Sequence, residues 1–311
     1  MPSRRLGQSL GVNNVTSKVC SYGCVYCQVG PTTEKIIKPR HFFTADQIYE
    51  AVAARVQNLR ARGLVIDYLT LVPDGEPTLD CALGESIDAK RDLDIPIAVI
   101  TNGTLLWRRD VRARLLRADL VSVKVDTVIE SAWHQINRPH PDLRLDTVLQ
   151  GIRELATSFD GTLITDTMLI ADTNDDVESL TETARFLTGL APNTVYLAVP
   201  TRPTTFKGVH GTSETGLTRA HEIFSARLQS VELLTGHEVG EFAYTGDARS
   251  DLLAVTAVHP MREEDVRHLL VKDRADWSLV EDLLAEGVLK STAYEGDRYF
   301  LRPVRCGRSW P

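Results

Sequence analysis

The sequence predicts an α/β protein: a partial (β/α)6 TIM-like barrel followed by a small C-terminal domain. Two observations support this fold class. From the N-terminus to about residue 230, short β-branched apolar runs alternate with helix-patterned segments, which is typical of βαβ units and a parallel sheet. From Ala248 the pattern changes to helical segments and a hairpin signal. Because six strand-like runs are too few for a closed eight-stranded barrel, we expect the sheet to remain open.

The barrel elements follow from apolar patterning. The strand-like runs span residues 9–15, 65–72, 95–101, 119–125, 161–170 and 194–200. Apolar residues at helical spacing predict helices between them, among others at 110–117, 144–158 and 175–189. The first helix is expected to begin at Thr44, which forms a capping box with Gln47, and to end at Gly63.

The C-terminal segment is predicted to be a domain of its own. We expect a barrel domain at 1–230, a linker at 231–247 and a second domain at 248–311. Helical patterns at 251–258, 265–270 and 277–285 precede the runs VLKSTAY and RYFLRPV, which flank a turn at Gly296. Three helices followed by a hairpin form the winged-helix arrangement, so the domain is expected to be winged-helix-like.

Composition narrows the class of protein. The chain has 311 residues, of which 43% are hydrophobic and 25% charged, the usual mix of a globular protein. It has no apolar run long enough for a transmembrane helix, and Gly, Asn and Ser interrupt the segment after Arg5 where a signal peptide would be apolar. We therefore expect a cytoplasmic protein with no membrane contact. A net charge of −7 argues against a general nucleic-acid binder.

Three of the five cysteines lie close together, in the segment Cys20-Ser-Tyr-Gly-Cys24-Val-Tyr-Cys27. An odd number of cysteines grouped in this way does not fit a secreted disulfide framework. Thiolates are the usual ligands of [4Fe–4S] clusters, and three of them leave one iron open. A structural zinc site would need a fourth ligand, and a redox-active CxxC pair would leave Cys20 unused. Cys20, Cys24 and Cys27 are the predicted metal ligands.

The CxxxCxxC spacing, with Tyr26 before the last cysteine, resembles the radical S-adenosylmethionine (SAM) superfamily. Other segments match the pattern of that superfamily in order over roughly residues 1–230. They are Asp74-Gly75-Glu76-Pro77 after the second strand, Thr101-Asn102-Gly103 after the third, Lys124 and Asp126 at the end of the fourth, and Met168 on the fifth. Asp74 stands where the GGE-type motif has its first glycine. VPDGEPTLD and ITNGTLL are similar to a little-characterised branch of iron–sulfur oxidoreductases near the wyosine-tRNA synthase group.

The resemblance implies a chemistry and its cofactors. These are one [4Fe–4S] cluster and SAM, which the open iron would chelate through its amino and carboxylate groups. One electron, from a donor of flavodoxin or ferredoxin type, would break a carbon–sulfur bond and give methionine and a 5′-deoxyadenosyl radical. That radical would abstract hydrogen from a substrate, here an unidentified small molecule or nucleoside.

The same resemblance implies roles for residues after the second and third strands. Glu76 would accept hydrogen bonds from the methionyl ammonium, Gly75 would let the backbone come close, and Pro77 would stiffen the turn. Thr101 and Asn102 lie at the carboxyl end of a strand, where parallel α/β folds bind their ligands.

The later strands supply the rest of the expected cofactor site. Lys124 would pair with the SAM carboxylate or with a substrate anion, and Asp126 would hold the ribose hydroxyls. Met168 would pack on adenine or simply belong to the core. Tyr26 completes the set of cofactor-binding residues, and no catalytic residue is assigned.

Two other functions remain open at this point. The neighbouring family suggests modification of a tRNA base of the wyosine type. An iron–sulfur regulator could instead bind DNA through the winged-helix region, but its third helix, WSLVEDLLAEG, carries three acidic residues and no Lys or Arg. Such a helix would make poor phosphate contacts. We therefore expect the C-terminal domain to dock on the barrel or to hold a tRNA or protein partner.

Overall fold

The computed structural model describes residues 2–3, 5–235, 246–258, 260–294 and 296–303. The predicted site residues all fall inside these ranges. Arg4, Cys306 and most of the expected linker lie outside them.

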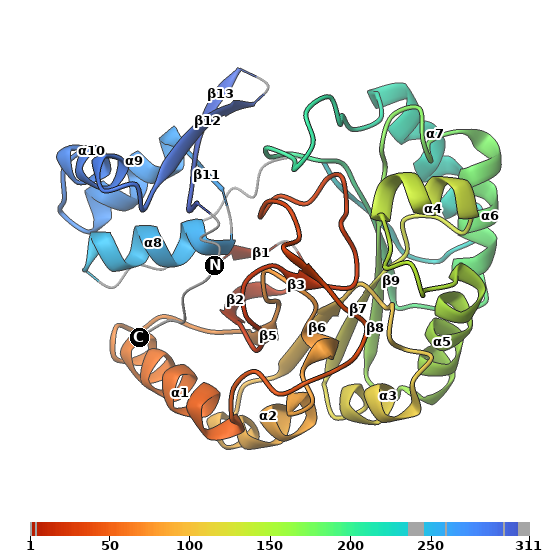
Figure 1. Ribbon diagram of the computed structural model, residues 1–311, viewed down its shortest axis with the longest axis horizontal. Coiled ribbons are helices and arrows are strands. Elements are labelled where there is room, and N and C mark those ends of the chain that lie inside the picture. The colour runs from red at the N-terminus through yellow and green to blue at the C-terminus, as the bar shows by residue number, and fades with distance from the viewer. Residues whose placement is uncertain (1, 4, 236–245, 259, 295, 304–311) are drawn as a thin grey trace.

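A curled sheet of eight strands in the order β1-β2-β5-β6-β7-β8-β9-β10 forms the centre of the larger part (Figure 1). Neighbours from β2 to β10 pair in parallel, and β1 (Pro2–Ser3) pairs antiparallel with β2. The parallel strands are β2 (Gly7–Val12), β5 (Tyr68–Leu71), β6 (Ile97–Thr101), β7 (Leu120–Lys124), β8 (Thr162–Met168), β9 (Thr194–Ala198) and β10 (Val231–Leu234). The open, partial barrel is thereby confirmed.

β10 corrects the predicted number of strands in this barrel. It pairs in parallel with β9 and gives the sheet a seventh parallel strand, where six were expected. It occupies the first four residues of the segment expected to be a linker. Its sequence, Val-Glu-Leu-Leu, is short and partly exposed because it lies at the edge of the sheet, so it has no apolar run to reveal it.

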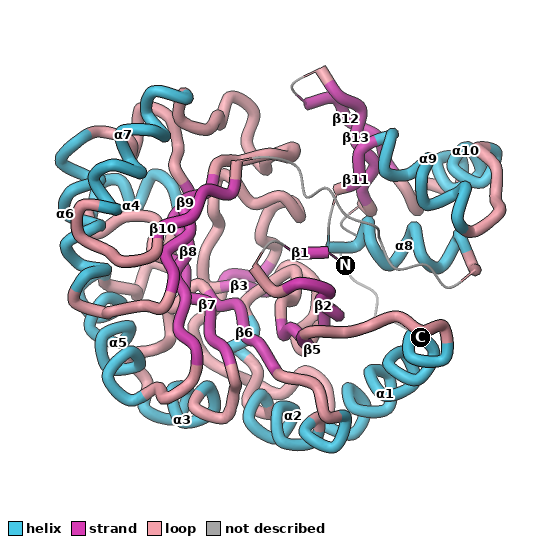
Figure 2. Tube along the Cα trace, turned by 180° about the vertical axis from the view of Figure 1, so that it is seen from behind, coloured by secondary structure: helices cyan, strands magenta, loops and turns pink. Residues whose placement is uncertain are grey.

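Helices cover the outer face of the sheet (Figures 1 and 2). They are α1 (Ala45–Ala61), α2 (Leu83–Ala89), α3 (Arg109–Leu115), α5 (Leu145–Ser158), α6 (Val177–Thr188) and α7 (Glu214–Ser225). The capping box of α1 is confirmed: the Thr44 hydroxyl accepts from Gln47 N at 3.2 Å, and Thr44 N donates to Gln47 Oε1 at 3.0 Å. Gly63 has φ +72° just after this helix, as expected of a helix stop.

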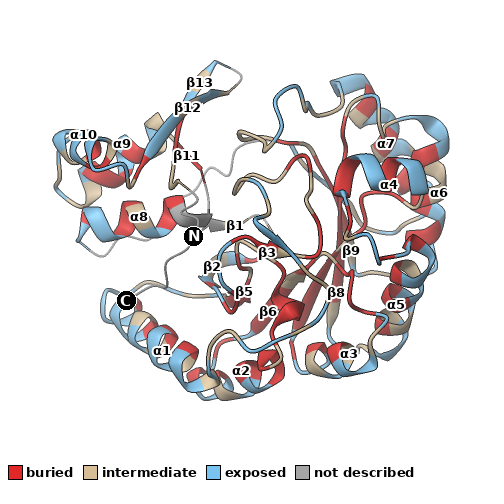
Figure 3. Ribbon diagram, in the orientation of Figure 1, coloured by how far each residue is buried: buried red, intermediate tan, exposed pale blue. Residues whose placement is uncertain are grey.

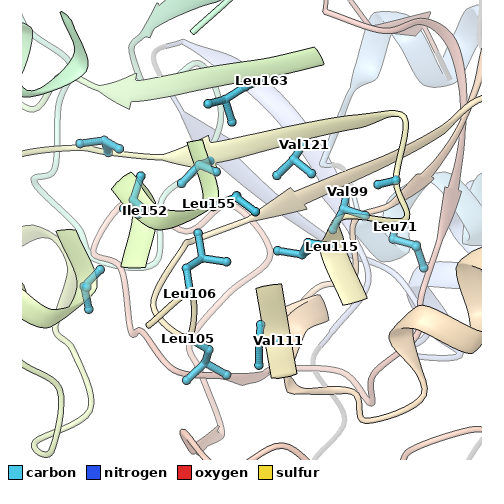
Figure 4. Close-up of a cluster of buried hydrophobic side chains, with 14 of the residues drawn as sticks. Leu71, Val99, Leu105, Leu106, Val111, Leu115, Val121, Ile152, Leu155 and Leu163 are labelled. Carbon is cyan, nitrogen blue, oxygen red and sulfur yellow. The ribbon is translucent and has the colours of Figure 1, made fainter. Parts of the chain in front are cut away.

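Successive side chains along the barrel strands point alternately to the outer face, which packs against the helices, and to the concave face. Val121 and its outward-facing counterparts pack against the helices in the main core, which Figure 4 shows around Val99, Ile152 and Leu155. Leu120 faces the concave side, where it packs in a small separate cluster with Leu6, Ala98, Ile164 and Tyr196. The central strands β5 to β9 are buried along most of their length, whereas the outward sides of the helices are exposed (Figure 3). The concave face is therefore left for polar residues near the carboxyl ends of the strands.

The C-terminal part has its own core cluster, which includes Leu252, Val266, Leu283 and Phe300. Its elements are α8 (Ala248–Val258), β11 (Met261–Arg262), α9 (Glu263–Lys272), α10 (Ser278–Ala285), β12 (Lys290–Tyr294) and β13 (Asp297–Leu301). The strands form an antiparallel sheet in the order β11-β13-β12. Pro260 precedes β11 rather than a helix, because the short strand pairs with β13 before α9 begins.

Contacts join this part to the barrel. Arg55 on α1 lies 3.2 Å from the buried Asp251 carboxylate on α8. The Tyr299 hydroxyl donates to the carbonyl of Thr201 at 3.1 Å, just beyond the end of β9.

In the described ranges, no helix is both long and apolar enough to cross a membrane.

Candidate functional site

The cysteine loop lies across the carboxyl ends of the strands. It starts at β3 (Val19–Cys20), which pairs in parallel with β4 (Glu34–Lys35). Backbone bonds fasten it: Glu76 N donates to Val19 O at 3.0 Å, and Val25 N donates to Ile136 O at 2.8 Å. Ile136 belongs to α4 (Glu130–Asn137), a helix that the pattern did not predict. The loop is thereby tied to the segments that follow β5 and β7.

Each cysteine of the loop is half-buried, free of disulfide bonds, and contacted by one side-chain N–H donor. The donors come from separate segments: one precedes the loop, one follows β6, and one ends α4. The pairs are Lys18 Nζ with Cys27 Sγ at 3.4 Å, Asn102 Nδ2 with Cys20 Sγ at 3.5 Å, and Asn137 Nδ2 with Cys24 Sγ at 3.5 Å. Hydrogen bonds to sulfur suit thiolate ligands of a cluster, because they orient the sulfurs and offset their charge.

Burial affects the protonation of these thiols. It raises the pKa of Cys24 to about 12, with a further contribution from the charge of Asp126. It also raises the pKa of Cys20, where the Glu76 carboxylate adds to the effect. Both groups are therefore thiols at neutral pH in the metal-free chain, and binding of a metal must displace their protons.

Glu76 joins the ends of β5 and β6. Its Oε1 accepts from Thr78 N at 3.1 Å, from Thr78 Oγ1 at 2.5 Å and from Thr101 Oγ1 at 2.6 Å. Its Oε2 accepts from Asn102 N at 2.8 Å. Burial raises the pKa of Glu76, although the bonds from Thr101, Thr78 and Asn102 oppose the shift. Pro77 is buried at the start of the short 3₁₀ turn η1 (Pro77–Leu79) that follows.

Asp74 and Gly75, which precede Glu76, lie directly against the cysteine loop and the segment before it. A Cβ on Gly75 would lie 2.2 Å from the carbonyl oxygen of Val19, so no side chain fits between this turn and the loop. Asp74, which replaces a glycine of the family pattern, accepts from Ser17 Oγ at 2.5 Å, and its carbonyl accepts from Lys18 N at 2.9 Å. The aspartate at this position therefore adds a hydrogen bond that holds the segment before the cysteines.

A second polar group surrounds Asp126 at the end of β7. Its Oδ2 accepts from the Tyr26 hydroxyl and, at 2.6 Å, from Asn137 Nδ2, while its Oδ1 accepts from Met168 N at 2.9 Å. The side chain of Met168 packs with Tyr26 and Ile136 in a small apolar cluster on the concave side. The carboxylate is thus already well occupied by the chain's own donors.

Lys124 lies between this group and the concave face. Its Nζ is 2.7 Å from Asp166 Oδ1, 3.9 Å from Asp126 Oδ1 and 5.1 Å from the centre of the Tyr26 ring. Arg5 reaches the other oxygen of Asp166, with Nη1 at 2.7 Å. Burial alone would raise the pKa of Asp166, but Lys124 and Arg5 hold it below its usual range. Arg5 therefore crosses the concave face to β8.

Comparison with known proteins decides the family. The model of the radical SAM superfamily matches residues 14–185, more than half of the chain. The chain belongs to the radical SAM superfamily.

Its relatives agree. A UPF0026 protein of Methanocaldococcus jannaschii is 42% identical over 307 residues, which cover 98% of this chain and 95% of that one. Among solved structures, a radical SAM methyltransferase from Sphaerobacter thermophilus has a TM-score of 0.56 at 19% identity, covering 74% of this chain and 66% of that one. TYW1 with a lysine–pyruvate adduct has a TM-score of 0.53 at 15% identity, covering 70% and 74%. These two structures share the fold.

Radical SAM enzymes use a [4Fe–4S] cluster and SAM, and the residues of this chain fit both. The loop presents free thiols, each with an N–H donor, and the turn at Gly75 leaves no side chain between Glu76 and the loop. Within the described ranges, no three His, Cys, Asp or Glu side chains are grouped closely enough to hold a single metal ion.

Sequence reasoning missed part of this candidate site. Lys18 is not among the predicted site residues, although its position two residues before Cys20 is a signal in the sequence. Asp166 is a charged residue inside an apolar, β-branched strand, which is a signal for an inward-facing partner. Arg5 is not among the predicted site residues either; it contacts Asp166, because the β1–β2 turn directs it to the concave face.

Proposed function

We propose that Cys20, Cys24 and Cys27 hold the [4Fe–4S] cluster of a radical SAM enzyme, and that SAM binds beside it. The observation that carries the proposal is the set of three thiols, each contacted by one side-chain N–H donor from a different segment. Two of those donors, Asn102 and Asn137, also bond within the Glu76 and Asp126 groups. When bound, the cluster supplies the electron that cleaves SAM reductively.

Glu76 and its neighbours are proposed to receive the methionyl end of SAM. Oε2 of Glu76 accepts one bond where a carboxylate oxygen can accept two, so it can receive an ammonium N–H. Asn102 would fix the position of this carboxylate relative to Cys20, because its backbone N–H bonds to Glu76 and its side chain to the sulfur. Gly75 lets the two segments lie against each other.

The later strands are proposed to hold the rest of SAM. Lys124 is a cation beside the Tyr26 ring and can attract the carboxylate of SAM or a substrate anion. Met168 offers an apolar surface to adenine. Asp126 orients Tyr26 and Asn137, and a ribose hydroxyl would bond to it in exchange for the Tyr26 hydroxyl.

The substrate is proposed to be a small molecule or a nucleoside that occupies the concave face, where hydrogen can be taken from it. Arg5, Lys124 and Asp166 give this face fixed charges. The likeness to TYW1 is one of fold at 15% identity, so it does not favour a tRNA substrate. A one-electron carrier of flavodoxin or ferredoxin type would supply the electron.

We also propose that residues 248–311 form a winged-helix-like domain that docks on the barrel. Its separate core cluster and its bonds to Thr201 and Arg55 support this arrangement. The acidic surface of α10, with Glu281 and Asp282 exposed, favours a packing or partner-binding role over the reading of DNA.

Release of 5′-deoxyadenosine tests the proposed activity. The chain, reconstituted with iron and sulfide under anaerobic conditions, is incubated with SAM and dithionite, and 5′-deoxyadenosine and methionine are quantified by chromatography. We expect both products in equal amounts from the wild type and from Cys81→Ser, whose thiol lies outside the loop, and neither from Cys24→Ser. Release from a variant that lacks all three loop cysteines would overturn the proposal.

A further inference from the structure

Lys18 occupies an unusual position directly before the cysteine loop. Its φ is +64°, in the left-handed region that residues other than glycine seldom adopt. Three bonds hold it there: its N–H donates to Asp74 O at 2.9 Å, and its carbonyl accepts from Thr33 N at 3.0 Å and Glu34 N at 3.3 Å. Such a conformation is unfavourable for a residue with a side chain and persists only where the surroundings enforce it. The fold therefore fixes this lysine in place.

The ammonium of Lys18 is buried against sulfur. The residue is 2% exposed, and the one contact of Nζ among the described residues is with Cys27 Sγ, at 3.4 Å. Lys124 differs, because it is paired with the Asp166 carboxylate at 2.7 Å. A buried ammonium is costly unless an anion lies beside it. The geometry thus places an unmatched positive charge at the site where the metal ligands converge.

We propose that Lys18 is the fixed counter-charge of the iron–sulfur site, paired with the Cys27 thiolate, and that it makes the cluster easier to reduce. This inference rests on the proposed function, because it requires the cluster to sit on the loop cysteines.

The physical reason is the charge balance of reduction. One electron added to the cluster and its thiolates makes the assembly more negative by one unit. A nearby cation that is shielded from water stabilises the more negative state. Asn102 and Asn137 give the other two sulfurs neutral N–H donors, so among these three contacts Lys18 alone brings a full charge.

Lys35 provides a matched control. It is also a lysine at the cysteine loop, where its Nζ would lie 3.5 Å from a Cβ on Gly23 and donates to Arg138 O at 2.7 Å. Unlike Lys18, it is exposed, so water and salt screen its charge. Its removal changes the net charge equally but should leave the reduction potential unchanged.

The test is a redox titration of the reconstituted full chain with dithionite and mediators. The EPR signal of the reduced cluster measures the reduced fraction at each potential. Lys18→Met removes donor and charge, Lys18→Gln removes the charge only, and Lys18→Arg keeps the charge. We expect the equilibrium constant for reduction to fall at least tenfold in Lys18→Met, a shift of 59 mV for one electron. Lys18→Gln should show most of that loss, whereas Lys18→Arg should stay within threefold of the wild type.

Iron content, measured first, separates the outcomes. A wild type without a cluster refutes the proposed function itself. Unchanged potentials in loaded Lys18→Met and Lys18→Gln overturn the counter-charge role and leave the proposed function intact. If both neutral variants fail to load while Lys18→Arg loads, the need for a cation at this position is supported. If Lys18→Arg also fails to load the cluster, the inference is overturned, because position 18 would then matter only for the backbone conformation and not for its charge.

Discussion

At the residue scale, Glu76 is the link between two parts of the site. It is buried, it accepts four bonds from Thr78, Thr101 and Asn102, and it keeps one oxygen with a single partner. A carboxylate held in this way has little freedom to rotate. In the proposed role, it would therefore receive the ammonium group of SAM with little further entropy cost.

Glu76→Ala is expected to weaken SAM binding. Loss of one charge-assisted hydrogen bond costs about 1.5–3 kcal/mol, roughly a 10- to 150-fold rise in Kd. Equilibrium dialysis of SAM against the reconstituted protein measures it. Thr78→Val, which removes a donor from Oε1 only, serves as the control and should change the Kd much less. An unchanged Kd in Glu76→Ala would show that the ammonium binds elsewhere.

Asp166 provides a pH-dependent prediction. Lys124 and Arg5 hold its pKa below the usual range despite burial, so its contribution to stability is present above the unfolded-state pKa of about 3.9 and is lost as the pH falls through the folded-state value. We expect Asp166→Asn to lower the free energy of unfolding by about 3 kcal/mol at pH 7, since Arg5 loses its carboxylate partner and Lys124 keeps only the more distant Asp126, at 3.9 Å.

Urea unfolding of the metal-free chain at pH 7, 5 and 4 checks this effect. The difference between wild type and Asp166→Asn should stay constant from pH 7 to 5 and begin to shrink near pH 4. Asp160→Asn, at an exposed loop position, should have no effect at any of these pH values. A difference that grows as the pH falls would contradict the assigned ion pairs.

The sequence identified the residue types of the site, but several of their partners could not be predicted. Cys20 and Glu76 lie in motifs that carry their own spacing. Asn137 and Asp166 contact the site only after α4 and β8 have folded beside it, at separations of 113 residues from Cys24 and 161 residues from Arg5. No local pattern encodes such long-range pairs.

At the element scale, prediction succeeded where apolar periodicity or a cap was strong. The capping box of α1 and the buried strands are such cases. α4 was missed because it is only eight residues long, has no side-chain cap and ends at Arg138 with φ +44°. β10 was missed because an exposed edge strand needs no apolar run. In both cases tertiary contacts, rather than local preference, fix the element.

The packing of α5 gives a prediction at this scale. A Cβ on Gly151 would lie 2.1 Å from the backbone nitrogen of Trp107, so the helix and the segment after β6 are in direct backbone contact. Gly→Ala normally favours a helix, but here we expect Gly151→Ala to destabilise the chain by about 1–3 kcal/mol.

Thermal unfolding compares Gly151→Ala with Gly189→Ala. At Gly189 the nearest atom to a Cβ is 3.4 Å away, an ordinary contact, so that variant should unfold near the wild-type temperature. Equal melting temperatures for the two variants would contradict the close packing of α5.

At the scale of the whole molecule, the barrel carries the site and the C-terminal part touches the segment after β9. That segment also reaches the cysteine loop, since Arg202 Nη1 donates to Gln28 at 3.2 Å and Thr205 Oγ1 donates to Cys27 O at 2.7 Å. The Tyr299 bond to Thr201 therefore places the C-terminal part within a few residues of a segment that contacts the cysteine loop. The sequence predicted two units, with docking on the barrel as one alternative, but not the residues of this contact, because a side chain of one part meets a backbone carbonyl of the other only once both have folded.

DNA binding distinguishes the enzyme from a regulator. The exposed acids on α10 lead us to expect that the full chain binds random duplex DNA no more tightly than about 10⁻⁴ to 10⁻⁶ M at physiological salt, the non-specific range. Fluorescence anisotropy at several salt concentrations measures it. A dissociation constant well below a micromolar would instead support an iron–sulfur regulator.

The central claim is that the three loop cysteines hold one [4Fe–4S] cluster with an iron open to SAM. The most direct measurement is iron content together with the EPR spectrum of the dithionite-reduced protein, before and after addition of SAM. We predict about four irons per chain and a signal that changes when SAM binds. Cys81→Ser should behave like the wild type, and replacement of Cys20, Cys24 and Cys27 by serine should abolish the iron content and the EPR signal. A cluster retained in that triple variant, or stoichiometric zinc in the freshly purified protein, would contradict the account.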